Sequence, residues 1–322
     1  MKPIRLLLVS TFIISFAATA ASAQSWPTKP LRAIVPFAAG SSTDIIPRVV
    51  FEQLSQQFGQ AIVVENRSGA GGTIGAAFVA KSDADGYTIL ASGAAHTIAP
   101  ALYPKLTYHP SADFAAVVPL GISPNVLVVS PAKGFKTAGD LVAAAKKRPG
   151  AFNFSSVGVG SATHLSAERF RSSAGIDAVH VPFNGGAQAM SEVMAGRVDF
   201  FFGPPALVLP HIRAGKLAAL VVNGASRTPA LPEVPTTQEA GFRDAEYPIW
   251  YALFVPKQTP RAVVNRLHDE TLKALQAPKV QARLAALFVD TMVMAPNDLD
   301  AYVQKEIDLN SALVNAAGIK LN

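Results

Sequence analysis

Hydroxyl side chains cluster in two short, glycine-containing stretches, each of which follows an apolar run. The first stretch is PFAAGSSTD (36–44) and the second is SSVGVGSATH (155–164). Small residues let the backbone approach a ligand, and a helix that begins after such a turn presents free N–H groups and the positive end of its dipole. The pattern therefore predicts two sites that bind an anion such as a carboxylate. Ordinary helix capping by Ser or Thr is the structural alternative for each stretch.

Catalytic, metal and cofactor motifs are weak by comparison. The chain has no Cys, and its six His residues show no HExxH or HxH spacing, so we expect no metal. GAGGTIG (69–75) has the spacing GxGxxxG and lacks a suitably placed acidic residue, so we expect no dinucleotide and no other cofactor. Ser161 and His164 are three residues apart and could lie close on a helix, but no carboxylate orients them. We therefore expect a protein that is not an enzyme, with an exported serine hydrolase as the remote alternative.

The N-terminus has the features of a secretory signal peptide. Lys2 and Arg5 precede a short apolar run, and Ala21-Ser22-Ala23 has the form of a cleavage site. The run is short for a membrane-spanning helix, which needs about 20 apolar residues. We expect residues 1–23 to be removed and the mature chain to be periplasmic.

The overall charge argues against nucleic-acid binding. Without Lys2 and Arg5, 26 of the 28 basic side chains remain, and against 22 acidic ones the net charge is +4. These charges are scattered, whereas nucleic-acid binding requires a clustered basic surface. A mild positive field still favours acidic solutes. With about 300 mature residues, two domains are more probable than one.

Apolar, β-rich runs alternate with helical patterns along most of the chain. Runs such as 31–37, 61–66, 125–130 and 178–183 are each followed by a glycine-containing loop and a helix, which predicts an α/β fold with parallel sheets. After the strand expected at 248–256, three helices are expected at 260–276, 278–288 and 296–318, each beginning at or near Pro.

Several segments together resemble one known family. They are WPTKPLRAIVPFAAGSSTDIIPRVV, VVENRSGAGGTIGAAFVAKSDADGYTIL, HVPFNGGAQAMSEVMAGRVDFFFGP, LPEVPTTQEAGF and EIDLNSALVNAAGIKL. They are similar to the Bug-type periplasmic solute receptors of tripartite tricarboxylate transporters, over essentially the whole mature chain. The resemblance implies a two-lobed periplasmic binding protein fold (type II-like) with the ligand cleft between the lobes. Lobe 1 would comprise 24–123 and 250–322, and lobe 2 would comprise 124–249.

The resemblance also implies a set of ligand-binding positions in this chain. The first stretch contributes Phe37, Ala39, Ser41, Ser42, Thr43 and Asp44, and the second contributes Ser156, Gly158, Gly160, Ser161, Thr163 and His164. Gly185 and Gly186 would open a third helix at the cleft, and Gly203 would end a strand there. The donors would be nearby N–H groups and the hydroxyls of Ser41, Ser42, Thr43, Ser161 and Thr163. His164 could instead pack or cap; His96 carries the same uncertainty, and Phe37 could belong to the core.

Three residues depart from the pattern of the family. Ser41 stands where Gly is usual, and it adds a hydroxyl while losing the freedom to adopt a positive φ. Pro47 fits a helix if Asp44 is its N-cap, which favours a capping role for Asp44 over contact with an amine. Asn310 replaces a common Trp, and we expect an effect on packing only.

The sequence therefore predicts a receptor that traps a small organic acid, such as a dicarboxylate, an amino acid or an aromatic acid. Its partner would be the membrane permease of the transporter, and a monomer is the expected form. The alternative is a sensor subunit that presents the same ligand to a membrane signalling protein.

Overall fold

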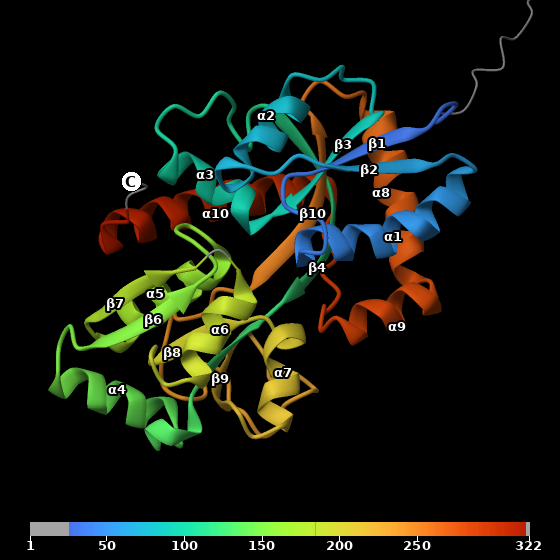
Figure 1. Ribbon diagram of the computed structural model, residues 1–322. Helices are drawn as coiled ribbons and strands as arrows, with labels where there is room; N and C mark the ends of the chain where they lie inside the picture. The colour runs from blue at the N-terminus through green and yellow to red at the C-terminus, as the bar shows by residue number, and fades with distance from the viewer. Residues whose placement is uncertain (1–25, 184, 320–322) are drawn as a thin grey trace, which may run out of the picture.

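The computed structural model describes residues 26–183 and 185–319. The expected signal peptide, residues 1–23, lies outside the described residues. Two five-stranded sheets form the framework of two lobes, which are visible in Figure 1 as an upper and a lower body. No helix within the described ranges is both long and apolar enough to span a membrane.

The sheet of lobe 1 has the order β2-β1-β3-β10-β4. Its strands are β1 (Leu31–Val35), β2 (Ile62–Asn66), β3 (Thr88–Gly93), β4 (Phe114–Ser123) and β10 (Ile249–Pro256). The sheet of lobe 2 has the order β7-β6-β8-β5-β9. Its strands are β5 (Asn125–Val129), β6 (Phe152–Ser156), β7 (Ala178–Pro182), β8 (Phe200–Gly203) and β9 (Ala218–Asn223).

The α/β prediction is confirmed, but the expectation of parallel sheets is wrong for one strand in each lobe. β10 runs antiparallel to both β3 and β4, and β5 runs antiparallel to both β8 and β9. Each of these strands is the first one that the chain forms after it crosses from the other lobe. A strand that enters a sheet without a crossover helix can run against its neighbours.

The two lobes repeat one topology. In each sheet the first parallel strand (β1 or β6) lies between its two successors, and the antiparallel strand separates the third strand from the last. The helices of the repeat are α1 (Ser42–Phe58), α2 (Thr73–Ala80) and α3 (Ala94–Leu102) in lobe 1, and α5 (Ala162–Ala174), α6 (Gly186–Met194) and α7 (Pro205–Arg213) in lobe 2. Corresponding strand-to-helix junctions therefore exist in the two lobes.

The remaining described helices are α4 (Ala138–Lys147) and the three at the C-terminus. α4 begins with a capping box, in which Thr137 and Asp140 satisfy each other's backbone N–H groups. Short 3₁₀ turns lie at Ala70–Gly72 and Pro131–Lys133. The C-terminal helices are α8 (Arg261–Gln276), α9 (Pro278–Ala286) and α10 (Pro296–Ala317), as the sequence predicts.

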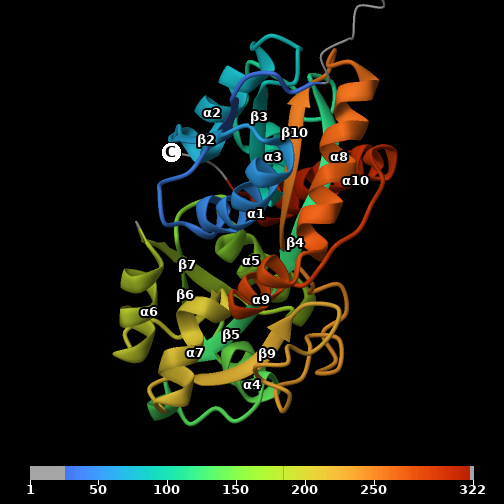
Figure 2. The ribbon, with the colours of Figure 1, turned by 90° about the vertical axis from the view of Figure 1, so that its right-hand side faces the viewer.

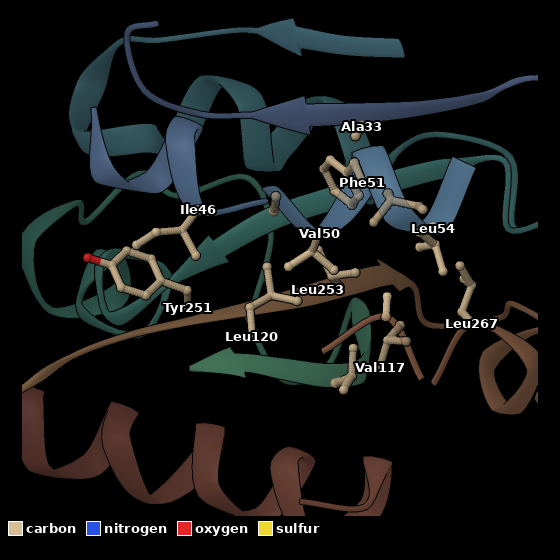
Figure 3. Packing of buried hydrophobic residues seen from close by; sticks show 14 of the residues in the cluster. Ala33, Ile46, Val50, Phe51, Leu54, Val117, Leu120, Tyr251, Leu253 and Leu267 are labelled. Carbon is tan, nitrogen blue, oxygen red and sulfur yellow. The ribbon is translucent and has the colours of Figure 1, made fainter. Parts of the chain in front are cut away.

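Each sheet is packed on both faces by apolar side chains. In lobe 1, Figure 3 shows Val50 of α1 near Leu253 of β10, Leu54 on the side of Leu267 of α8, and Phe51 beside Ala33 of β1, and all of these side chains are buried. This packing fixes the position of α1 on the sheet. The N-terminus of α1, which lies at the end of the first serine-rich stretch, is therefore held by a rigid core.

The chain crosses between the lobes at two adjacent points. β4 ends at Ser123 and β5 begins at Asn125, so only Pro124 separates the two strands. The return strand β10 pairs Ile249 with Ser123, and Gly224 approaches Pro124 closely. Figure 2 shows β4 and β10 running together toward the lower lobe.

Candidate ligand-binding site

A cleft of about 640 Å³ lies between the lobes. Its lining residues in lobe 1 are Phe37, Ala38, Gly40, Ser41, Ser42, Thr43, Gly71, Gly93, Ala94, Ala95, Ile98, Leu102, Tyr103, Ile249 and Trp250. Its lining residues in lobe 2 are Val157, Val159, Gly160, Ser161, Ala162, Thr163, Gly185, Gly186, Ala187, Pro204 and Leu207. Both serine-rich stretches thus reach the same space, and this volume is in the range of small-molecule sites.

Helix N-termini from both lobes converge on the cleft. The first turns of α1 and α3 line it in lobe 1, and the first turns of α5 and α6 line it in lobe 2. Both views of the ribbon place α1 and α3 on the side of lobe 1 that faces α5 and α6 (Figures 1 and 2). The first N–H groups of a helix have no partner within it and carry the positive end of the dipole. The convergence therefore favours a bound anion.

Ser41 is the N-cap of α1 and its hydroxyl has no partner. The Oγ atom is buried and makes no hydrogen bond, and no side chain caps this helix. Its φ is −71°, while the neighbouring Gly40 has a φ of +82°. Ser at position 41 is therefore unstrained. Buried hydroxyls are nearly always hydrogen-bonded, so an unpartnered one in a cleft indicates a place for a ligand or water.

The buried carboxylate of Asp44 stabilises the loop between β1 and α1 through hydrogen bonds. The expectation that Asp44 is the N-cap is wrong, because the N-cap of α1 is Ser41, three residues earlier. The Asp44 carboxylate accepts hydrogen bonds from Gly40 N (2.9 Å), Arg48 Nε (2.8 Å) and Asn66 Nδ2 (2.9 Å). Burial acts to raise the pKa of Asp44, but these hydrogen bonds outweigh it and hold the pKa below its usual value. The residue is not among those that line the cleft, which agrees with a structural role.

The loop of lobe 2 is tied together internally. Ser161 Oγ donates to Gly158 O (2.7 Å), and Thr163 Oγ1 accepts from Val157 N (3.0 Å). The amides of Gly158 and Gly160 are also used, since they donate to Ser156 Oγ and His164 Nδ1. Helix capping, the structural alternative for this stretch, is therefore present. The first-turn amides of Ala162 and Thr163 have no partner within the helix, and both residues line the cleft.

Ser161 and His164 do not form a nucleophile–base pair. The contact between them is from the backbone N–H of His164 to Ser161 Oγ (3.3 Å). The His164 ring accepts from Gly160 N through Nδ1 (3.0 Å), and its Nε2 lies 3.6 Å from Glu168 Oε1. The ring is buried and is not part of the cleft lining. A hydrolytic mechanism would need the ring to accept the Ser161 proton.

His96 lies away from the cleft lining. Its ring is buried against Tyr108, Phe114 and Phe254, with ring centroids 4.8–5.7 Å apart. Neither ring nitrogen makes a well-formed hydrogen bond. Burial lowers the pKa of His96 to about 3, an effect that the Pro110 carbonyl offsets only in part. The surroundings of His96 therefore agree with a role in packing.

Some of the predicted ligand-binding positions line the cleft, and the others do not. Phe37, Ser41, Ser42, Thr43, Gly160, Ser161, Thr163, Gly185 and Gly186 line the cleft. Ala39, Asp44, His96, Ser156, Gly158, His164 and Gly203 do not. Gly203 is needed for packing, because a Cβ there would lie 2.5 Å from Val208, and its neighbour Pro204 reaches the cleft instead. Among the described residues, no group of three or more possible metal ligands is brought together.

Sequence reasoning missed the junction between β3 and α3. Gly93, Ala94 and Ala95 line the cleft, but their side chains carry no hydrogen-bond donor. The donor-bearing side chain nearest to them in the sequence is that of His96, which the prediction therefore included. The repeated strand–loop–helix pattern is the available signal, since the loop after β3, like those after β1 and β6, joins the end of a strand to a helix N-terminus that lines the cleft. Tyr103, Ile249 and Trp250 also line the cleft, and no local motif marks them.

Comparison with known proteins agrees with this geometry. Residues 46–319 match the family described as "Tripartite tricarboxylate transporter family receptor". BugT of Bordetella pertussis (strain Tohama I) is 34% identical over 325 residues, covering 100% of both chains.

Solved structures of similar proteins share the fold. R. palustris Rpa4515 with adipate is 31% identical, with a TM-score of 0.81 over 92% of this chain and 100% of that one. The periplasmic binding protein BugD is also 31% identical, with a TM-score of 0.79 over 92% of this chain and 100% of that one. The predicted two-lobed periplasmic binding protein fold is therefore confirmed.

Proposed function

The chain belongs to the tripartite tricarboxylate transporter receptor family, and from this we propose that it captures a small organic acid and delivers it to a membrane permease. The acid would bind in the cleft through a carboxylate, held between the N-termini of α1 and α5. The permease would then recognise the ligand-bound form. The chain would act by binding and would leave the ligand chemically unchanged.

The unpartnered hydroxyl of Ser41 is the observation that carries this proposal. A hydroxyl that is buried in a cleft and lacks a partner gains a full hydrogen bond when an acceptor arrives. A carboxylate oxygen is a strong acceptor, and a hydrogen bond to a charged group contributes about 1.5–3 kcal/mol. The free N–H groups at the start of α1 and α5 would hold the same anion. The adipate named for the similar R. palustris protein is an acid of this kind.

The location and assembly follow from the same proposal. The chain would be exported with residues 1–23 as a cleaved signal peptide and would work in the periplasm as a monomer. Lobe 1 would comprise 24–123 with 250–322, and lobe 2 would comprise 124–249. The division of strands between the two sheets supports these boundaries.

Calorimetric titration of residues 24–322 with organic acids tests the proposal. The protein is first unfolded, dialysed and refolded to remove any ligand that copurifies. The probes are adipate, hexanoate and 3-phenylpropanoate, with glucose and ATP as non-carboxylate controls. We expect saturable binding of at least one acid, and Ser41→Ala should weaken that binding by about 10-fold or more.

Ser226→Ala is the matched control, because Ser226 is exposed and lies outside the cleft lining. Its affinity for the acid should equal that of the wild type. Binding of glucose or ATP in place of every acid, or equal affinities for Ser41→Ala and the wild type, would contradict the proposal.

A further inference from the structure

The cleft contains no charged side chain among its described lining residues. None of them is Asp, Glu, Lys, Arg or His. The only nearby carboxylate in the first loop, that of Asp44, is buried and already accepts from Gly40, Arg48 and Asn66. A carboxylate ligand can still bind, because helix N-termini supply neutral donors and partial positive charge. A cationic group has no such partner.

An ammonium group on the ligand would meet an unfavourable environment. In an α-amino acid the ammonium is attached to the carbon next to the carboxylate, so it would lie within the same field of helix N-termini. A charge removed from water without a partner is strongly destabilised. The absence of an available lining carboxylate thus acts against amino acids.

Apolar side chains form the rest of the wall. Ile98 and Leu102 approach from α3, Leu207 approaches from α7, and Ile249 lies at the start of β10. In the second loop Val157 and Val159 are 37% and 36% exposed, although both are large apolar residues. Exposed apolar side chains gathered in a cleft indicate a surface that a ligand covers.

We propose that the cleft selects an organic acid with an apolar body, aliphatic or aromatic, and no ammonium group. This inference rests on the proposed function and narrows its ligand class. Helix N-termini would hold the carboxylate, and the apolar side chains of α3, α7 and the second loop would cover the body of the molecule. Acids rich in hydroxyl groups would bind weakly, because their hydroxyls would lose water without finding enough partners.

Paired ligands that differ by one group test the inference. Hexanoate is compared with norleucine, adipate with 2-aminoadipate, and 3-phenylpropanoate with phenylalanine, by calorimetry on refolded residues 24–322. For every pair in which the plain acid binds, we expect the amino acid to bind at least about 100-fold more weakly. Gluconate, a hydroxyl-rich acid with the same six-carbon chain as hexanoate, should also bind more weakly than hexanoate.

A variant that supplies the missing charge sharpens the test. Ala187 is exposed in the first turn of α6 and lines the cleft, so Ala187→Asp adds a carboxylate where a helix tolerates one. It should reduce the preference for hexanoate over norleucine by at least about 10-fold. Gly139→Asp makes the same charge change in the exposed first turn of α4 and should leave the preference unchanged.

The outcomes separate this inference from the proposed function. If amino acids or gluconate bind as tightly as the plain acids, the inference is overturned while the receptor function stands. If no acid of any kind binds, both are overturned. An unchanged preference in Ala187→Asp would also contradict the charge argument.

Discussion

The imidazole rings of His164 and His180 stack with their centroids 3.8 Å apart and their planes inclined by 14°. Each ring is hydrogen-bonded to part of the second serine-rich stretch (155–164). His164 Nδ1 accepts from Gly160 N (3.0 Å), and His180 Nε2 is hydrogen-bonded to Ser156 Oγ (2.6 Å), which in turn accepts from Gly158 N (3.1 Å). Two histidines outside the cleft lining thereby fix the loop that faces it.

This stack makes stability depend on pH. Burial, and then the neighbouring His164, lower the pKa of His180 to about 4, and Glu168 offsets only part of the change. In the unfolded chain the pKa is about 6.5, so between these values the unfolded state binds the extra proton. The free energy of unfolding should therefore fall as the pH is lowered from about 6.5 to 4. Urea denaturation across this range measures it.

His180→Gln should reduce the dependence of the free energy of unfolding on pH, and it keeps a side chain that can form a hydrogen bond with Ser156. His211→Gln is the control, because His211 lies on α7 outside the stack. Buried His96, whose pKa is also lowered, keeps a residual slope in every variant. The same slope in His180→Gln as in the wild type would refute the assignment.

Gly160 lies at a close contact between the lobes. A Cβ at Gly160 would lie 2.1 Å from Leu102 Cδ1, and its φ is +74°. Gly160→Ala should therefore destabilise the fold through both backbone strain and overpacking, the latter costing about 1–3 kcal/mol. Gly134→Ala is a matched control, because Gly134 has a φ of +77° and open space around it.

The steric origin of this effect can be tested by a second substitution. Thermal unfolding should show less destabilisation by Gly160→Ala in a Leu102→Ala background than in the wild type, because the clash is removed. Equal costs for Gly160→Ala and Gly134→Ala would leave strain alone as the cause.

Asp44 should contribute to stability mainly through its buried hydrogen bonds and its ion pair with Arg48, and only to a small extent through the helix dipole. Asp44→Asn removes the ion pair with Arg48 and weakens the hydrogen bonds from Gly40 and Asn66. We expect a loss of about 1–3 kcal/mol at neutral pH, measured by urea denaturation. The folded pKa lies below the usual value, so this contribution is present above the unfolded pKa of about 3.9 and is lost as the pH falls through the folded pKa.

Asp298→Asn provides the comparison, since Asp298 occupies the equivalent first-turn position of α10 and is exposed. It should cost no more than the helix-dipole effect, about 0.3–1 kcal/mol. Similar losses for both substitutions would mean that the buried hydrogen bonds of Asp44 contribute little.

Asn310 joins three elements near the crossing between the lobes. Its Nδ2 donates to Thr97 Oγ1 (3.0 Å) and its Oδ1 accepts from Tyr247 OH (2.8 Å), with all three residues buried. The expectation of an effect on packing only is therefore too narrow. Asn310→Leu leaves two buried hydroxyls without this partner, so we expect a loss of about 1–3 kcal/mol. Asn315→Leu, at an exposed site on the same helix, should change stability little in the same thermal melts.

Local patterns in the sequence predict the elements well and their directions poorly. The serine-rich loops after β1 and β6 and the three C-terminal helices stand where the residue patterns place them. The antiparallel directions of β5 and β10 depend on where the chain changes lobe, which no local pattern states. For the site, side-chain chemistry identified Ser41 and Thr43 but also His96, because burial in an aromatic cluster arises only from long-range packing. The donors of Gly93–Ala95 are backbone groups and have no signature in residue type.

The single residue between β4 and β5 has a mechanical consequence. Pro124 is the whole of that connection, and the return strand begins beside it. A joint this short would act as a pivot: the lobes would turn relative to each other about it, while their separation at the pivot stayed nearly constant. A larger ligand would then hold the lobes at a wider angle, with the largest displacement at the rim. The angle between the lobes would thus depend on the length of the bound ligand, and a partner protein would recognise that angle.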